Sequence, residues 1–240
     1  IKSFNASQRM ENVQPPIISI VSDLIKKNPG TISLGQGIVY YGPPQRVINE
    51  INKLNPSSDY HAYSEVEGLP KLRSIISKKL KYENKINMGE KYDLVVTAGS
   101  NMAFMNALLA IADPSDEIIL LRPYYFNHEM AINMINCKSV IVDTDSDYQP
   151  NLEKIINSIT PQTKAIVTVS PNNPSGAVYK KKMLEKINML CRERKIYHIS
   201  DEAYEYFTFG EINHFSPGSI PDSSDYTISL YSLSKAYGFA

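Results

Sequence analysis

The sequence lacks the long apolar runs and the charge imbalance that mark membrane and nucleic-acid-binding proteins. No apolar run approaches the roughly 20 residues that a membrane-spanning helix needs. Lysine and arginine together number 25, aspartate and glutamate also number 25, and the formal net charge is zero. Binding to nucleic acid or to an anionic membrane surface normally requires a clear basic surplus. We therefore expect neither a nucleic acid nor a membrane among its partners.

Cysteine and histidine are also scarce. The two cysteines, Cys137 and Cys191, stand in no spacing typical of a metal site or a redox motif. The four histidines show no metal-ligand spacing either. We therefore expect no bound metal and a reducing compartment, the cytoplasm.

The apolar content is sufficient for a substantial core. Hydrophobic residues make up 42% of the 240 residues, enough for one sizeable core or for one core and part of another. Residues 1–30 form a predicted arm, whose short amphipathic helix should end at the stop signal "NPG" at 28–30. The chain begins at Ile1 and stops at Ala240 within an apolar, glycine-containing stretch, so we expect the natural protein to be longer.

Short apolar runs alternate with helical patterns from residue 93 onward. The runs are rich in isoleucine and valine and do not alternate with polar residues, which is typical of strands covered on both faces. A helical stretch at 180–194 carries one apolar stripe. This alternation predicts an α/β fold with a mostly parallel sheet sandwiched by helices. The six predicted strands are 93–97, 117–121, 139–143, 165–169, 196–200 and 227–232.

Ligands of such sheets bind beyond the carboxyl ends of the strands, and polar groups follow several of these runs. The first run leads into "AGSNMAF", where Gly99, Ser100 and Asn101 would open a helix and offer free N–H groups to a phosphate. The second run leads into "RPYYFNH", where a tyrosine ring could lie flat on a planar ligand.

The later runs add an amide, a carboxylate and an amine. "SPNNPSG" places asparagine side chains at the ligand edge of a central strand. Asp201 ends a buried run and needs a positively charged neighbour, because an unpaired buried carboxylate is costly. Tyr204 could face the same pocket. Lys235 follows the last run among small residues, and a desolvated lysine is a Schiff-base nucleophile.

Each of these features also has a purely structural explanation. The glycine and asparagine segments could be ordinary turns, the tyrosines could be core, Asp201 could cap a turn, and Lys235 could be a solvated surface group. Together, however, they supply a phosphate cradle, a stacking ring, an amide, a carboxylate and an amine. Pyridoxal 5′-phosphate (PLP) requires all five.

A set of motifs in fixed order resembles the class I/II aminotransferases, the fold-type I PLP-dependent enzymes related to aspartate and aromatic aminotransferases. The motifs cover nearly the whole chain, and only "PNNPSG" departs, by one residue, from the commoner "PNNPTG". Any one motif is weak, but the ordered set is highly specific. The motifs are "SLGQGIVYYGPP", "YSEVEGLPKLR", "TAGSNMAF", "PNNPSG", "SDEAY" and "SLSK".

The resemblance implies a role for each matching residue around the PLP ring. Asn173 and Tyr204 would donate hydrogen bonds to the ring oxygen O3′. Asp201 would pair with the protonated ring nitrogen, and Tyr125 would stack on the ring. Lys235 would bind the cofactor as a Schiff base and move the substrate proton. The resemblance also implies a cis peptide bond between Asn173 and Pro174.

The same resemblance assigns the phosphate and the substrate. The substrates would be an amino acid and a 2-oxo acid, and Gly37 and Asn173 would lie near the substrate. Tyr63 would reach the phosphate of the other subunit, which implies a homodimer. The phosphate-binding residues within one chain would be Gly99, Ser100, Asn101 and Ser232.

Function and domain organisation follow as expectations. The favoured function is a PLP-dependent aminotransferase, with residues 1–40 as an arm belonging to an incomplete small domain and 41–240 as the incomplete PLP-binding large domain. One alternative is a PLP-dependent carbon–sulfur β-lyase of the same fold, for which Lys235 would serve equally well. A second is a cofactor-binding regulatory module without enzymatic activity, although the sequence has no basic helical segment for DNA.

Overall fold

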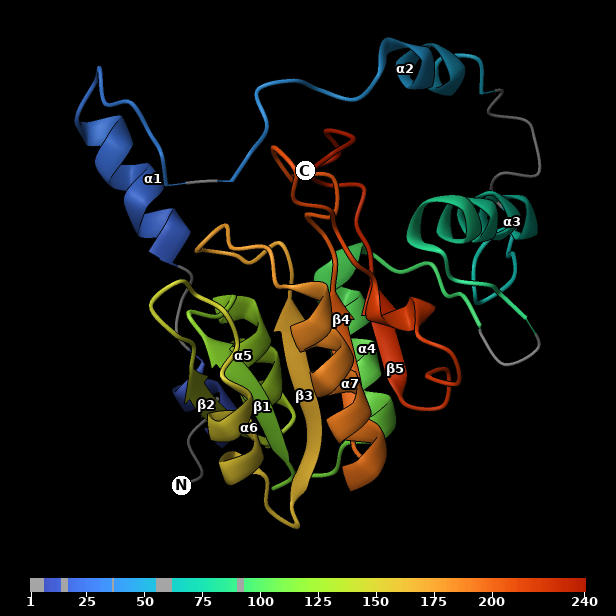
Figure 1. The fold of residues 1–240 in the computed structure, drawn as a ribbon. Coiled ribbons are helices and arrows are strands. Elements are labelled where there is room, and N and C mark those ends of the chain that lie inside the picture. The colour runs from blue at the N-terminus through green and yellow to red at the C-terminus, as the bar shows by residue number, and fades with distance from the viewer. Residues whose placement is uncertain (1–6, 14–16, 36, 55–61, 90–92) are drawn as a thin grey trace, which may run out of the picture.

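The centre of the fold is a five-stranded parallel sheet (Figure 1). The computed structural model describes residues 7–13, 17–35, 37–54, 62–89 and 93–240. The sheet has the strand order β2-β1-β3-β4-β5. Its strands are β1 (Glu117–Arg122), β2 (Lys138–Asp143), β3 (Thr163–Val169), β4 (Tyr197–Asp201) and β5 (Thr227–Leu230).

The strand order reverses direction once, between β1 and β3. The chain runs from β1 outward to β2, then crosses back over β1 to β3 and continues through β4 to β5. The connections after β1 and β3 therefore leave the sheet on opposite sides, and folds of this kind bind ligands beyond the carboxyl ends of these two strands. This switch point is where the fold is expected to bind a ligand.

Helices cover both faces of the sheet (Figure 1). α4 (Gly99–Ile111) and α5 (Phe126–Met134) pack on one face, and α6 (Leu152–Ser158) and α7 (Lys181–Arg194) pack on the other. Side chains alternate along each strand. In β1, Ile118 and Leu120 join the first core, whereas Ile119 and Leu121 join the second. All four are buried, which explains the uninterrupted apolar run.

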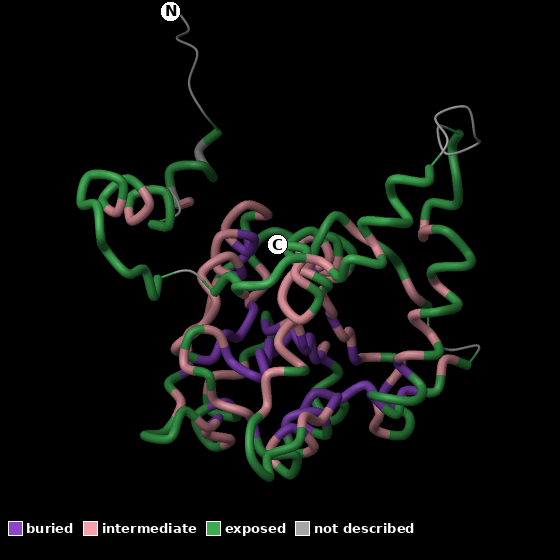
Figure 2. Tube along the Cα trace, turned by 90° about the horizontal axis from the view of Figure 1, so that it is seen from above, coloured by how far each residue is buried: buried purple, intermediate pink, exposed green. Residues whose placement is uncertain are grey.

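The N-terminal helices lie outside these layers, where Figure 2 shows exposed chain around a buried centre. No residue of α1, α2 or α3 is buried. None of the helices in the described ranges is long and apolar enough to cross a membrane. The three N-terminal α-helices are α1 (Ile17–Lys27), α2 (Gln45–Ile51) and α3 (Pro70–Lys79). The short helices of the described chain are the 3-10 helices Gln8–Asn12 and Pro217–Ser219 and the π-helix Leu80–Asn84.

Five of the six predicted strands are confirmed to within three residues at either end, and so is the helix predicted at 180–194. The strand predicted at 93–97 is wrong. This segment is extended but unpaired: Val96 N–H donates to the Glu67 carbonyl (2.8 Å), and the Leu94 carbonyl accepts from Arg73 Nε (2.8 Å). Its backbone bonds therefore go to the segment around α3 instead of to a neighbouring strand.

A buried polar network joins β3, β4, β5 and α7. His198 in β4 is fully buried, and its Nε2 lies 2.9 Å from Thr168 Oγ1. Its Nδ1 lies 3.1 Å from Asn188 Nδ2, which also donates to Thr227 Oγ1 (2.8 Å). Because an amide nitrogen can only donate, Nδ1 accepts and Nε2 carries the proton. Burial lowers the pKa of His198 from 6.5 to about 3.

We predict that His198 stays neutral from pH 8 to pH 5. Its ring carbon resonances should not titrate in this range, as measured by NMR on histidine-labelled protein. The unfolded chain binds this proton near pH 6.5 and the folded chain does not, so stability falls as the pH drops below 6.5. The expected loss is about 1.4 kcal/mol per pH unit. A titration midpoint near 6.5 in the folded protein would contradict the assignment.

Candidate functional site

Lys235 lies at the end of the sheet where the switch point opens. It follows β5 by five residues, and its Nζ donates a hydrogen bond to the Gly37 carbonyl (2.8 Å). The same Nζ lies 5.7 Å from the ring centroid of Tyr204. A Cβ added at Gly37 would come within 3.6 Å of Tyr204 Oη and 4.0 Å of Lys235 Nζ. The structure therefore brings together three residues that are distant in the sequence.

Asn173 joins this group from the connection after β3. Its Nδ2 donates to Tyr204 Oη (3.3 Å). The Asn173–Pro174 peptide is cis, as predicted. Asn172 closes the corner, because its Oδ1 accepts from both the amide and the hydroxyl of Ser175 (3.1 and 2.7 Å). The stiff proline-rich corner thus directs one asparagine inward and uses the other to fold the turn.

Tyr204 is set between several polar groups. Burial raises the pKa of its phenol, and so do the nearby groups of Tyr125 and Asp201, while the hydrogen bond from Asn173 lowers it. Tyr204 therefore holds its proton at neutral pH. This arrangement suits a hydroxyl that donates to an anionic ligand oxygen.

Asp201 is the last residue of β4, and only 5% of its side chain is exposed. Its Oδ2 lies 3.1 Å from His128 Nε2, and its Oδ1 accepts from the Ala203 amide (3.1 Å). The carboxylate therefore caps the following turn and also has an imidazole partner. Of the two explanations considered for this residue, the cap is confirmed, and the His128 imidazole is a polar partner for the buried carboxylate.

Sequence reasoning missed His128. This residue is 2% exposed, stacks on Phe104 of α4 (ring centroids 4.1 Å apart) and meets the ring of Tyr125 edge-on at 5.3 Å. The sequence did contain a signal for it, because "RPYYFNH" follows a predicted strand and Asp201 ends another that needs a partner. Tyr125 itself accepts a hydrogen bond at Oη from Asn127 Nδ2 (2.6 Å).

The predicted phosphate cradle begins α4. Gly99 is the first residue of the helix and has a φ of +81°, a conformation that favours glycine. The amides of Ser100 and Asn101 then lie in the first turn, where helix N–H groups have no partner within the helix. Phe104, in the next turn, packs on His128, so this helix end lies beside the site. Ser232 Oγ accepts from the Ser234 amide (3.1 Å) and shapes the turn that leads to Lys235.

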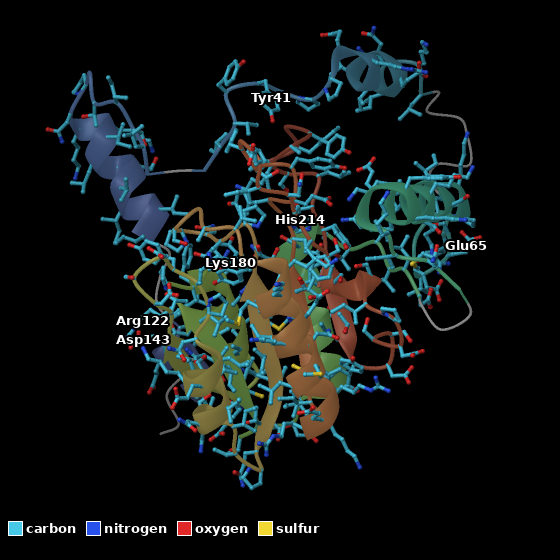
Figure 3. All side chains as sticks on the ribbon, viewed as in Figure 1. Tyr41, Glu65, Arg122, Asp143, Lys180 and His214 are labelled. Carbon is cyan, nitrogen blue, oxygen red and sulfur yellow. The ribbon has the colours of Figure 1, made fainter. Side chains whose placement is uncertain are left out.

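The segment 37–42 lies across the loop that carries Lys235. Tyr41, labelled in Figure 3, donates from its hydroxyl to the Ala236 carbonyl (3.2 Å). Gly238 has a φ of +68°, and an added Cβ would come within 2.6 Å of the Gly42 carbonyl carbon. Only glycine fits this close approach of two backbones.

Tyr63, the residue expected to serve a second subunit, is a surface residue of the described chain. Its side chain is fully exposed in the single chain. The described residues include no group of three or more histidine, cysteine or acidic side chains that could hold a metal ion. What the arrangement offers chemically is an amine, a neutral phenol, an amide and a buried carboxylate at one end of the sheet.

The chain is similar in sequence to known aminotransferases. The chain is 32% identical over 240 residues to an aromatic aminotransferase of Arabidopsis thaliana, covering 97% of this chain and 58% of the relative. It is 39% identical over 178 residues to a probable aspartate/prephenate aminotransferase of Aquifex aeolicus, covering 73% of this chain and 45% of the relative. The chain therefore spans only about half the length of these relatives.

Solved structures agree with the sequence relatives. An alanine aminotransferase from Pyrococcus furiosus superposes with a TM-score of 0.86 at 34% identity, covering 97% of this chain and 60% of that one. An aspartate aminotransferase from Thermus thermophilus with maleate superposes with a TM-score of 0.87 at 29% identity, covering 99% and 62%. The family model for aminotransferase class I and II matches residues 29–240, and the chain belongs to this family.

Proposed function

We propose that the whole protein is a PLP-dependent aminotransferase that moves an amino group from an amino acid to a 2-oxo acid. The observation that carries the proposal is the convergence of Lys235, Tyr204 and Asn173 at one end of the sheet, with Asp201 buried beside them. The relatives are named as aminotransferases, and none of those cited is named as a lyase. This favours amino transfer over β-elimination.

The chemistry of the side chains fits PLP. Asp201 is a buried carboxylate that suits a positively charged ring nitrogen, and Tyr125 offers an aromatic face near it. Asn173 and the protonated Tyr204 suit the ring oxygen O3′. The start of α4, with Gly99, suits the phosphate. PLP would supply an electron sink that stabilises a carbanion at the substrate α-carbon.

The chain's own residues would then divide the work. Lys235 Nζ would hold the cofactor aldehyde covalently and, once released by the amino acid, would move the α-proton. Asp201 would keep the ring nitrogen protonated, and His128 would hold that carboxylate in place. Ser100, Asn101 and Ser232 would complete the phosphate site. Gly37 and Asn173 would lie beside the substrate.

Assembly, domains and location are further parts of the proposal. We propose a homodimer in which Tyr63 reaches the partner's phosphate, since its exposed side chain is free for such a contact. Residues 41–240 would form the PLP-binding domain and residues 1–40 an arm of a second domain. Both cysteines are free and buried, which agrees with a reducing cytoplasm.

The first prediction from this function concerns Lys235. Protein incubated with PLP and reduced with borohydride should carry the cofactor on the peptide that contains residue 235, as located by mass spectrometry. Lys235→Met should abolish the label, whereas Lys180→Met, at an exposed lysine, should keep it. A label elsewhere in the wild-type protein would contradict the assignment.

The same two variants test the reaction itself. With an amino acid and a 2-oxo acid as substrates, the full-length protein and Lys180→Met should form a new amino acid without releasing ammonia. Lys235→Met should not. Release of pyruvate and ammonia without amino exchange would instead identify a β-lyase.

The second prediction concerns Asp201. Asp201→Ala should still bind PLP at Lys235 but should slow hydrogen–deuterium exchange at the substrate α-carbon by about 100-fold or more. Loss of the carboxylate removes about 3 kcal/mol of stabilisation from the developing carbanion. Asp225→Ala, at an exposed aspartate, is the matched control. A near-normal exchange rate in Asp201→Ala would exclude the proposed role.

The third prediction concerns the dimer. Tyr63→Phe should weaken PLP retention about tenfold, because it removes one hydrogen bond to a charged phosphate. Tyr40→Phe, at another fully exposed tyrosine, should have no effect. PLP affinity would be measured by fluorescence titration and the oligomeric state by light scattering. A monomer with full PLP affinity would rule out the shared site.

A further inference from the structure

The turn that carries Tyr204 has a second set of contacts, made by the two glutamates that flank Tyr204. The turn follows β4 and is tied to β5 by the Glu202 amide, which donates to the Leu230 carbonyl (2.8 Å). Within it, the Glu205 amide donates to the Glu202 carbonyl (3.0 Å). Tyr204 thus stands between two glutamates, and both of their side chains are nearly or wholly buried. Residues that bind the carboxylates of Glu202 and Glu205 therefore also fix the position of the turn.

Glu205 is bound by the last residue of α3 and by the last residue of the π-helix that follows it. Lys79 Nζ lies 2.5 Å from Glu205 Oε1, and Asn84 Nδ2 donates to Glu205 Oε2 (2.7 Å). The carboxylate is therefore engaged at both oxygens. Only 9% of the Glu205 side chain and 19% of the Lys79 side chain are exposed, so this ion pair is largely shielded from water.

Asn84 extends the contacts to the other glutamate. Its Oδ1 accepts from Lys79 Nζ (2.7 Å), and its Nδ2 donates to Ser216 Oγ (2.8 Å) as well as to Glu205. Ser216 Oγ in turn donates to Glu202 Oε2, which also lies 2.7 Å from His214 Nε2. Figure 3 labels His214 above the carboxyl ends of the strands.

The local backbone explains how Lys79 and Asn84 reach the same carboxylate. α3 ends at Lys79 and passes directly into the π-helix Leu80–Asn84. Lys79 and Asn84 are five residues apart, the spacing that a π-helical turn brings onto one side. The π-helix is stopped by Lys85, which has a left-handed φ of 61°. This rare conformation thus presents one cation and one amide to the turn.

We propose that Lys79 and Asn84 are positioning residues that fix the Tyr204 hydroxyl in the site by clamping Glu205 and, through Ser216, Glu202. This inference rests on the proposed function, in which Tyr204 donates to O3′ of PLP. Neither residue touches Lys235, Asn173 or Asp201 in any recorded contact among the described residues. They reach Tyr204 through the turn, and Lys79 Nζ also lies 4.7 Å from the ring centroid of Tyr231, which precedes Ser232.

The physical reason is the cost of a buried charge without a partner. A solvent-exposed ion pair contributes little, but removing one partner of a shielded pair leaves an uncompensated charge. Without Lys79, the Glu205 carboxylate would be stabilised by turning toward water, where it would be solvated. Because Glu205 is the residue next to Tyr204, that movement would draw the phenol away from Asn173 and Asp201.

The test follows Tyr204 in the protein without PLP. The variant Lys79→Met is compared with Lys81→Met, which removes an exposed lysine from the same π-helix. Carbon-13 labelling of the tyrosine rings gives the pKa of Tyr204 by NMR, with Tyr204→Phe to assign the signal. Displacement into water should lower that pKa toward 10, because burial is the main cause that raises it. Loss of a positive charge without movement would raise it instead.

A second readout links the turn to the cofactor. Lys79→Met should weaken PLP binding about tenfold, the effect of losing one hydrogen bond. Lys79→Arg should restore both readouts, and Lys81→Met should change neither. If Lys79→Met does not fold, Asn84→Ala provides the fallback, because it removes the other partner of Glu205 and leaves the Glu205 charge in place.

Each outcome decides the inference. A lowered Tyr204 pKa with weakened PLP binding, both restored by arginine, supports it. An unchanged or raised pKa overturns it, and so does a lowered pKa with unchanged PLP binding. If the wild-type protein binds no PLP, the proposed function fails, and the titration in the free protein alone still shows whether Lys79 positions the turn.

Discussion

The buried carboxylate of Asp201 is the constraint around which the site is built. A buried charge at the end of an inner strand needs a polar partner. The partner of Asp201 is His128, which lies in α5, the helix that follows β1. β3 lies between β1 and β4, so the pair spans the end of an intervening strand. His128 also stacks on Phe104, which fixes α4 against α5. The contact between Asp201 and His128, together with the stacking of His128 on Phe104, therefore links the sheet to two helices.

The next residue shows why two acids can follow one another at this place. Side chains alternate along a strand, so Asp201 and Glu202 leave the end of β4 in different directions. Asp201 meets His128, and Glu202 meets His214 and Ser216. Each acid has its own imidazole. The two acids of this dipeptide thus belong to different contact networks, one with His128 and one with His214 and Ser216.

The sequence predicted features that depend on local patterns, and it failed where distant contacts decide. The strands β1 to β5 and the helix α7 have apolar patterns that any window of the chain reveals. The segment 93–97 has the same pattern, but a strand also needs a neighbour to pair with, and its backbone bonds to Glu67 and Arg73 instead. Lys79 and Glu205 are 126 residues apart, and no local signal connects them.

Asp201 and Lys235 each have a different partner, and this makes the site suitable for the proposed chemistry. Asp201 and Lys235 belong to one site, and an ion pair between them would occupy both groups. In the structure, Asp201 Oδ2 lies 3.1 Å from His128 Nε2, whereas Lys235 Nζ donates to a neutral partner, the Gly37 carbonyl (2.8 Å). A carbonyl holds an amine less strongly than a carboxylate would. The carboxylate therefore stays anchored while the amine remains available to a ligand aldehyde, and segment 37–42 takes part in the site through its backbone.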